Sequence, residues 1–243
     1  MENYLKNNFS TTEVAERDLQ VIKSAQATLM RSVYLWMTLA LAITGFAAYV
    51  VASSPMLLQA VFGSKLTFWG LIIAEFALVM ILSARIHKMS APTATVMFIV
   101  YSLLNGVVLS SIFLLYTMSS IANVFFITAG TFGVMSVYGM VTKSDLSKVG
   151  NICLMALIGL IIATVVNFFI KSDMMMMVIS YIGVLVFVGL TAYDTWKIKQ
   201  DIQMYGTEVN DMTQRIALMG ALSLYLDFVN LFLYLLRIFG NRK

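Results

Sequence analysis

The chain has 243 residues, of which 60% are hydrophobic and only 12% are charged. Soluble domains carry about 25% charged residues, so this composition excludes an ordinary soluble globular protein. The formal net charge of +4 is spread over several connections and not gathered in a patch interleaved with aromatic residues, so no nucleic-acid partner is expected. One cysteine and one histidine leave too few ligands for a zinc or haem site, and we expect no cofactor.

The first 31 residues are polar and mixed in charge, without a short apolar core followed by a small-residue cleavage site. A cleaved signal peptide is therefore not expected. The sequence predicts a polar cytoplasmic tail over residues 1–31 and a membrane domain over residues 32–243. The first apolar segment is then expected to insert as its own uncleaved signal.

Apolar residues occur in seven blocks of about 20 residues, the length that crosses a hydrocarbon core. Backbone groups in lipid must be satisfied within the segment, so these blocks predict α-helices. The connections are too short for a second, soluble domain. The expected fold is all-α, a polytopic membrane protein with a seven-helix bundle whose spans are Ser32–Ala52, Thr67–Ala84, Thr93–Tyr116, Ile121–Val141, Asn151–Ile170, Met174–Tyr193 and Ile216–Phe239.

Lysine and arginine residues are distributed unevenly between the two sides of this bundle. The N-terminal tail and the second, fourth and sixth connections carry eleven of them, whereas the other side carries five. Basic residues concentrate on the cytoplasmic side of membrane proteins, so the N-terminus is predicted to be cytoplasmic. Seven crossings then leave the basic C-terminus outside, against the rule locally, and the alternative is that the last segment does not fully cross; we favour crossing because Ile216–Phe239 is long enough.

Polar residues follow one face of the last span. Ser223, Asp227, Asn230 and Tyr234 are spaced four, three and four residues apart, which aligns them on a helix. A carboxylate at the centre of a spanning helix costs about 2.5–3.5 kcal/mol on insertion scales, so it normally faces a bundle interior. We therefore predict that the seventh helix is central. The alternative for Asp227 is a carboxyl group that only packs against a hydroxyl or an amide.

Two further acids, Glu75 and Asp194, lie within or at the edge of apolar blocks. Asp194 is expected at the cytoplasmic end of the sixth helix, where an interfacial helix-end role is the alternative. Asp227 lies about 18 Å of helix rise beyond Arg215, so the two aspartates differ in nominal depth. The sequence leaves open whether they meet. Asp194 is the last residue on one face of the sixth helix. The same face also carries Ser180, Gly183, Phe187 and Thr191.

Four segments carry a resemblance to a known family: "GLTAYDTWKIK", "LSLYLDFVNLFLYLLRIFG", "SSIFLLY" and "YGMVTKSDLSKVGN". They closely resemble the Bax inhibitor-1 family of membrane proteins, in particular its bacterial members, from about Tyr34 to Arg242. The resemblance implies a multi-pass protein of the plasma membrane, here a bacterial inner membrane. It also implies a last helix ringed by the other six.

The same resemblance implies an activity and its residues. Characterised members leak calcium in a pH-dependent way, and aspartates of their sixth and seventh helices form a hydrogen-bonded, titrating pair that corresponds to Asp194 and Asp227. A basic residue at the end of the second helix latches to the sixth-helix aspartate. Arg85 is the nearest match, with Lys88 close by. Glu75 matches an acidic position in the second helix of some members, and we assign it with Ser223, Asn230 and Tyr234 to the polar stripe that lines the pore.

Physical chemistry suits such a pair to sensing pH. Two carboxyl groups in contact at low dielectric cannot both ionise cheaply, so one keeps a proton and donates a hydrogen bond to the other. A change in protonation alters which helices the pair ties together. Calcium prefers oxygen ligands, so Asp194 and Asp227 are also the candidate ligands for that ion.

Three classes of function compete. The favoured class is a pH-gated calcium leak channel, with the bilayer, calcium and protons as partners. The second is an interaction protein that modulates a membrane-bound protease or a stress response. The third is an intramembrane aspartyl protease, which needs a "GxGD"-type loop. Here "LTAY" precedes Asp194 and "SLYL" precedes Asp227, so we expect no enzyme.

Overall fold

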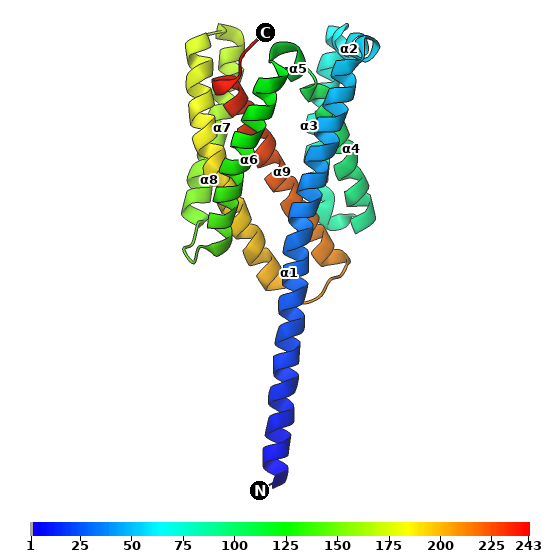
Figure 1. Ribbon diagram of the computed structural model, residues 1–243, viewed down its shortest axis with the longest axis vertical. Coiled ribbons are helices and arrows are strands. Elements are labelled where there is room, and N and C mark those ends of the chain that lie inside the picture. Colours follow the sequence, from blue (N-terminus) through cyan, green and yellow to red (C-terminus); the bar gives the residue numbers. More distant parts are fainter. Residues whose placement is uncertain (1) are drawn as a thin grey trace.

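A computed structural model describes the backbone of residues 2–243 and the side chains of residues 19–86 and 88–243. These residues form nine α-helices and a short 3-10 helix, with one isolated β-bridge between Tyr116 and Arg242 (Figure 1). The elements are α1 (Glu2–Ser53), α2 (Pro55–Phe62), α3 (Lys65–Arg85), η1 (Ile86–Lys88), α4 (Ala91–Leu109), α5 (Ile112–Leu115), α6 (Met118–Val141), α7 (Ser147–Ile170), α8 (Asp173–Tyr205) and α9 (Asp211–Phe239).

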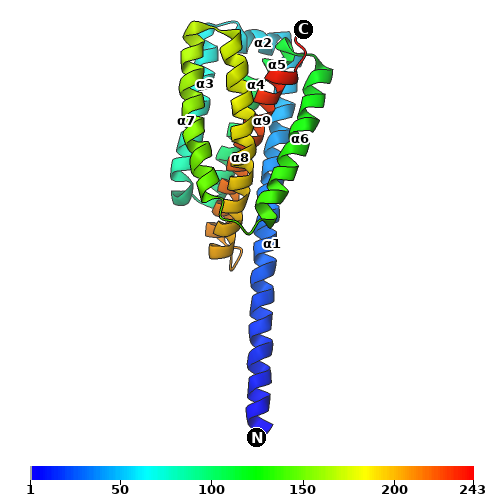
Figure 2. The same cartoon turned by 90° about the vertical axis from the view of Figure 1, so that its left-hand side faces the viewer.

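Seven helical segments are long and apolar enough to cross a membrane, as predicted. The N- and C-termini lie at opposite ends of the bundle, as an odd number of crossings requires (Figures 1 and 2). Large apolar side chains such as Phe46, Met80 and Phe169 are exposed on the outer surface, where lipid would cover them. The segments are Leu19–Ser53, Lys65–Arg85, Ala91–Leu115, Met118–Val141, Ser147–Ile170, Asp173–Tyr205 and Asp211–Phe239.

The first helix is continuous across the predicted boundary at residue 31. α1 begins at Glu2 and extends well beyond the rest of the bundle at its N-terminal end (Figure 1). Ala25 and Leu29, within the predicted tail, are buried. The polar side chains predicted for residues 1–18 lie outside the described side chains.

The helices differ from the predicted spans in several places. α8 continues past the predicted end at Tyr193 to Tyr205, because Lys and Gln propagate a helix well after the apolar run has stopped. The third block is interrupted between α4 and α5, where Ser110 and Ser111 bond their hydroxyl groups to carbonyls three residues back. A short apolar helix, α2, also precedes α3 and was not predicted.

Local capping explains where several helices begin. Ser54, Ser90, Thr117 and Ser172 each occupy the N-cap position and accept a hydrogen bond from a backbone amide of the first turn. α9 begins with a reciprocal capping box between Asn210 and Thr213. These caps fix the register with which each helix enters the bundle.

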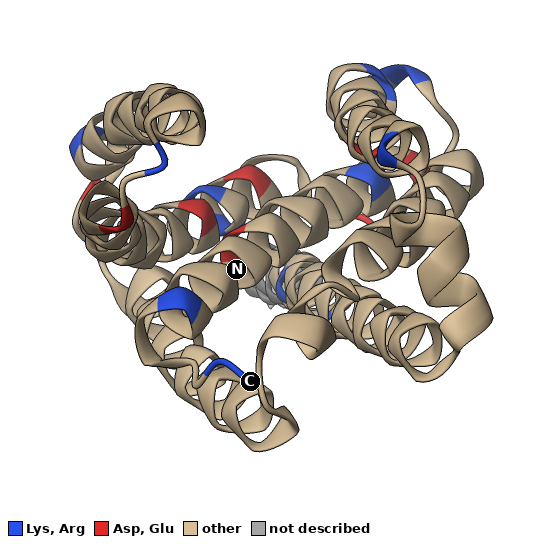
Figure 3. Cartoon of the chain, turned by 90° about the horizontal axis from the view of Figure 1, so that it is seen from above, with Lys and Arg blue, Asp and Glu red and all other residues tan. Residues whose placement is uncertain are grey.

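The last helix lies at the centre of the bundle, which confirms the prediction from its polar stripe. α9 packs against α1, α4, α6 and α8, and Leu224, Tyr225 and Leu231 are fully enclosed. The surrounding ring is uneven, because α3 packs mainly on α4 and α7 mainly on α8. Seen from above, most of the bundle is free of acidic and basic residues (Figure 3).

The upper end of α9 is held by the last residues of the chain. The Asn241 carbonyl accepts a hydrogen bond from the Thr117 amide at 3.1 Å, and the Lys243 amide donates to the Leu115 carbonyl at 3.0 Å. The Asn241 amide also donates to the Ser120 hydroxyl at 2.9 Å. The C-terminal segment therefore ties α9 to the α5–α6 connection.

Small residues allow α8 and α9 to approach closely. A Cβ atom added to Gly183 of α8 would lie 2.7 Å from ring carbons of Tyr234 on α9. A Cβ atom on Gly220 of α9 would lie 2.9 Å from the Ile198 side chain of α8. Glycine at such positions is the usual means of close helix packing in membranes.

We expect Gly183→Ala to lower the stability of the purified protein, because the added methyl group meets the Tyr234 ring. Overpacking of this kind costs about 1–3 kcal/mol. The matched control is Gly159→Ala on α7, where nothing lies within 4 Å of an added Cβ atom. Thermal unfolding in detergent measures both variants. Equal melting temperatures for the two would contradict the tight α8–α9 contact.

Candidate functional site

Asp227 lies within α9 with its side chain only 4% exposed. It is the one acidic or basic residue among the buried side chains that the structure describes. Its Oδ2 atom is enclosed and has no hydrogen-bond partner there. Burying such a group without a partner is costly, so the position is a candidate for function and not for packing alone.

A cavity of about 530 Å³ opens between the C-terminal half of α8 and the N-terminal half of α9. We call it the α8–α9 vestibule. Ser223, the first residue of the polar stripe, lines its wall, and Asp227 follows one helical turn later on the same face. The vestibule therefore ends one turn short of the buried carboxylate. Its charged lining residues are Asp194, Lys197, Asp201 and Arg215.

The structure brings Asp194 and Asp227 into one region. Asp194 is eleven residues before the end of α8, and Asp227 is sixteen residues after the start of α9. For antiparallel helices that share one end, this is a height difference of about 7.5 Å. The Asp194 charge acts on Asp227 electrostatically, but no hydrogen bond joins the two carboxyl groups among the described residues.

The expected position of Asp194 at a helix end was wrong. The apolar run stops beside it, but α8 continues through a polar segment, so Asp194 lies inside the helix. The predicted difference in depth shrinks for the same reason.

The C-terminal part of the polar stripe, at Asn230 and Tyr234, is filled by side-chain contacts and contributes no residue to the wall of the α8–α9 vestibule. The Asn230 side-chain amide donates to the Leu226 carbonyl of its own helix at 2.8 Å. The ring centroid of Tyr234 lies 5.8 Å from that of Phe187 on α8, and the Arg237 guanidinium lies 5.8 Å from the Tyr234 ring. The stripe therefore runs from a charged cavity at Ser223 to an aromatic contact at Tyr234.

Arg85, the predicted latch residue, is the last residue of α3 and is exposed. Among the described side chains it forms no ion pair or hydrogen bond with Asp194. Lys197, three residues further along α8, is the basic group that acts electrostatically on Asp194. The latch between Arg85 and Asp194 stays a prediction.

Glu75 does not join the polar stripe. Its carboxylate accepts a hydrogen bond from the Asn105 side-chain amide on α4. It interacts electrostatically with Tyr225, which lies two residues before Asp227 and so on the opposite face of α9. Glu75 therefore belongs to a separate polar cluster between α3, α4 and α9.

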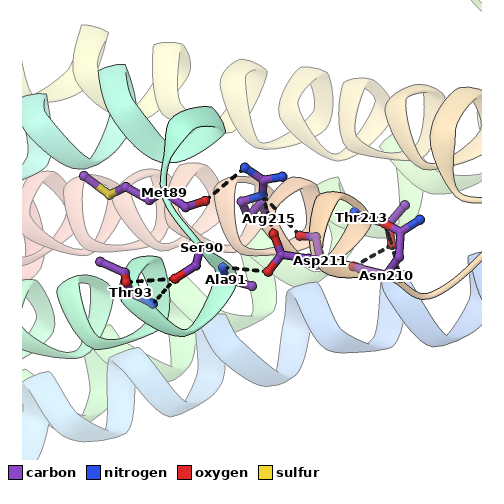
Figure 4. Close-up of polar contacts among 8 residues, drawn as sticks. All are labelled: Met89, Ser90, Ala91, Thr93, Asn210, Asp211, Thr213 and Arg215. Atoms are coloured by element: carbon purple, nitrogen blue, oxygen red, sulfur yellow. Dashed lines mark hydrogen bonds and ion pairs between the residues drawn. The ribbon is translucent and has the colours of Figure 1, made fainter.

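Two residues that sequence analysis did not assign to the site, Asp211 and Arg215, lie in the first two turns of α9 (Figure 4), and Arg215 lines the vestibule. Asp211 Oδ1 accepts a hydrogen bond from the Ala91 amide at 2.9 Å. Arg215 Nε lies 3.3 Å from Asp211 Oδ2, and Arg215 Nη1 donates to the Met89 carbonyl at 2.9 Å. The spacing of four residues between an acid and an arginine near a helix start is a signal that could have suggested this pair.

The described residues hold no group of three or more His, Cys, Asp or Glu side chains that could hold a metal ion. Calcium takes six to eight oxygen ligands. Asp194 and Asp227 would therefore need further oxygens from water or the backbone to hold calcium.

Comparison with known proteins decides the family. Residues 26–243 match the family described as "Inhibitor of apoptosis-promoting Bax1". The chain belongs to the Bax inhibitor-1 family. It is 51% identical to the inner membrane protein YbhL of Escherichia coli strain K12, over 89% of this chain and 92% of that protein.

Other members of the Bax inhibitor-1 family cover similar lengths. A protein of Borreliella burgdorferi is 42% identical, over 88% of this chain and 92% of the relative. A protein of Deinococcus radiodurans is 40% identical, over 89% of this chain and 91% of the relative. The resemblance carried by the aspartate segments is thus confirmed. The chain is a multi-pass membrane protein that contacts the lipid bilayer.

Proposed function

We propose that this Bax inhibitor-1 family member is a pH-sensitive calcium leak channel, gated by the protonation of Asp194 and Asp227. One observation carries the proposal: the buried carboxyl group of Asp227, whose Oδ2 has no hydrogen-bond partner among the described residues, lies one turn beyond the end of a charged vestibule that contains Asp194. A carboxyl group with a packing role alone would be expected to use both of its oxygens in hydrogen bonds.

In this proposal the vestibule binds a hydrated cation before it enters the narrow part of the path. Its wall carries the carboxylates of Asp194 and Asp201, which are hard oxygen ligands of the kind that calcium prefers. Beyond Asp227, Phe187 of α8 packs against Tyr234 of α9, and we assign this contact as the closed point of the proposed path. Conduction then requires that α8 and α9 separate near this contact.

A change in protonation can drive this separation, because it alters the interaction energy between α8 and α9. Two nearby carboxylates repel each other when both are ionised, and a shared proton turns the repulsion into a hydrogen bond. A shift in pH therefore changes how strongly α8 and α9 are held together at Asp194 and Asp227. This is a two-state element with a titratable bias.

The proposed location is the bacterial inner membrane, as for the E. coli relative. The vestibule lies at the same end of the bundle as the N-terminal part of α1 (Figure 1). The excess of basic residues on that side favours the cytoplasm, so calcium would meet the vestibule from the cytoplasmic face. The proposed role is transport and not catalysis, because neither aspartate lies in a "GxGD"-type loop.

The test is calcium flux through liposomes that contain the purified protein alone. We expect calcium to cross at a rate that changes with pH over a series from about pH 5 to pH 8. Protein-free liposomes are the control. The absence of flux at every pH would reject the channel. It would favour the second candidate, a modulator of a membrane-bound protease or a stress response, for which the long projecting helix α1 offers a contact (Figure 1).

A further inference from the structure

The start of α9 is fastened to the connection between α3 and α4. Asp211 reaches the Ala91 amide, and Arg215 reaches both the Asp211 carboxylate and the Met89 carbonyl (Figure 4). We call this set of contacts the α9 clasp, formed by Asp211, Arg215, Met89 and Ala91. It joins segments that are about 120 residues apart in the sequence.

The clasp is also part of the vestibule. Arg215 lines the cavity together with Asp194 and Ser223. The same side chain therefore forms part of the cavity wall and bonds to Met89 in the connection between α3 and α4. Twelve residues of helix connect Arg215 to Asp227, so a displacement at the clasp moves the segment that carries the buried carboxylate.

The chemistry of the clasp favours a contact that can open. Asp211 brings a negative charge to the N-terminus of α4, where unpaired amides and the helix dipole attract it. The planar guanidinium of Arg215 donates to Asp211 and to the Met89 carbonyl at the same time. A lysine ammonium is a compact point charge and lacks this fixed fork of donors. The Asp211 side chain is 54% exposed and that of Arg215 is 19% exposed, so water can replace these bonds without burying a charge.

We infer that the α9 clasp controls access to the α8–α9 vestibule, with Asp211 and Arg215 as the positioning residues that hold its mouth narrow. The inference rests on the proposed function, because it treats the vestibule as the entrance of the ion path. When the clasp is released, the start of α9 moves away from α4, and the opening through which solvent reaches Ser223 becomes wider.

The test measures access without calcium. Cys153 is the single cysteine of the chain, so Ser223→Cys in a Cys153→Ser background provides one thiol in the vestibule. The rate at which a membrane-impermeant sulfonated maleimide labels this thiol in the reconstituted protein reports access. We expect Arg215→Gln to raise the rate about tenfold, since the loss of a charge-assisted hydrogen bond shifts an equilibrium by about that factor.

Two milder variants keep the test informative if the Arg215→Gln protein does not fold. Arg215→Lys keeps the charge without the two-way donor geometry, and Asp211→Asn keeps an acceptor for the Ala91 amide without the ion pair. Both are expected to give intermediate rates. Lys143→Gln is the matched control, because Lys143 is an exposed cation on the α6–α7 connection whose side chain forms no hydrogen bond or ion pair with the described residues. It should label at the parent rate.

Labelling at the parent rate in all three clasp variants would overturn the inference, whatever the calcium flux. Faster labelling in the clasp variants supports the clasp even if the protein carries no calcium, and that result would then count against the channel alone. The two proposals therefore fail on different measurements.

Discussion

Asp227→Asn is expected to remove the pH midpoint of calcium flux or to move it outside the wild-type range. The substitution keeps the shape of the side chain and removes its charge. Asp194 then titrates as a single group without its partner in α9, so the proton that couples the two helices is lost. The measurement is calcium flux in protein-only liposomes at a series of pH values from about 5 to 8.

Asp173→Asn is the matched control for this result. Asp173 is an exposed acid in the first turn of α8, at the opposite end from the vestibule. The control should keep the wild-type pH profile. If Asp227→Asn also keeps that profile and changes only thermal stability, then Asp227 serves packing and the gating mechanism is wrong.

Tyr225→Ala is expected to cause a large loss of stability, greater than that of Gly183→Ala. The Tyr225 side chain is fully enclosed at the centre of the bundle, and its ring makes edge contacts with Phe98 and Tyr101. Its hydroxyl lies 2.7 Å from the Thr44 hydroxyl, which in turn donates to the Ser102 carbonyl at 2.9 Å. Removing a buried aromatic ring costs about 3–5 kcal/mol.

Two controls separate the contributions of the ring and the hydroxyl. Tyr225→Phe removes only the hydrogen bond to Thr44 and should cost about 0.5–1.5 kcal/mol. Tyr138→Ala removes a ring that is 47% exposed on α6 and should cost less than Tyr225→Ala. Thermal unfolding in detergent ranks the three. A Tyr225→Ala variant as stable as Tyr138→Ala would show that α9 is not the packed centre of the fold.

The architecture was largely predictable from sequence because membrane insertion imposes local rules. Twenty apolar residues must form a helix in lipid, and a charged residue on such a helix must turn inward. Asp227 and its spacing from Ser223, Asn230 and Tyr234 were therefore sufficient to predict that α9 is central. The family resemblance rested on longer segments around Asp194 and Asp227.

The helix ends and the long-range polar contacts could not be predicted, because the pattern of apolar residues does not determine them. A hydropathy change marks the membrane boundary but not the end of a helix, so α8 was predicted to end at Tyr193 and Asp194 was placed at its end. The clasp between Asp211 and Ala91 joins distant segments, and nothing local to either residue indicates the other. The bond between Glu75 and Asn105 was missed for the same reason.

The most direct test of the coupled pair is a double-mutant cycle on the pH dependence of calcium flux. Asp194→Asn, Asp227→Asn and the double variant are compared with the wild-type protein in protein-only liposomes. If the two carboxyl groups act as one unit, each single variant loses the wild-type midpoint and the double variant changes little further. Effects that simply add, or a wild-type midpoint in either single variant, would contradict the mechanism even if the protein conducts calcium.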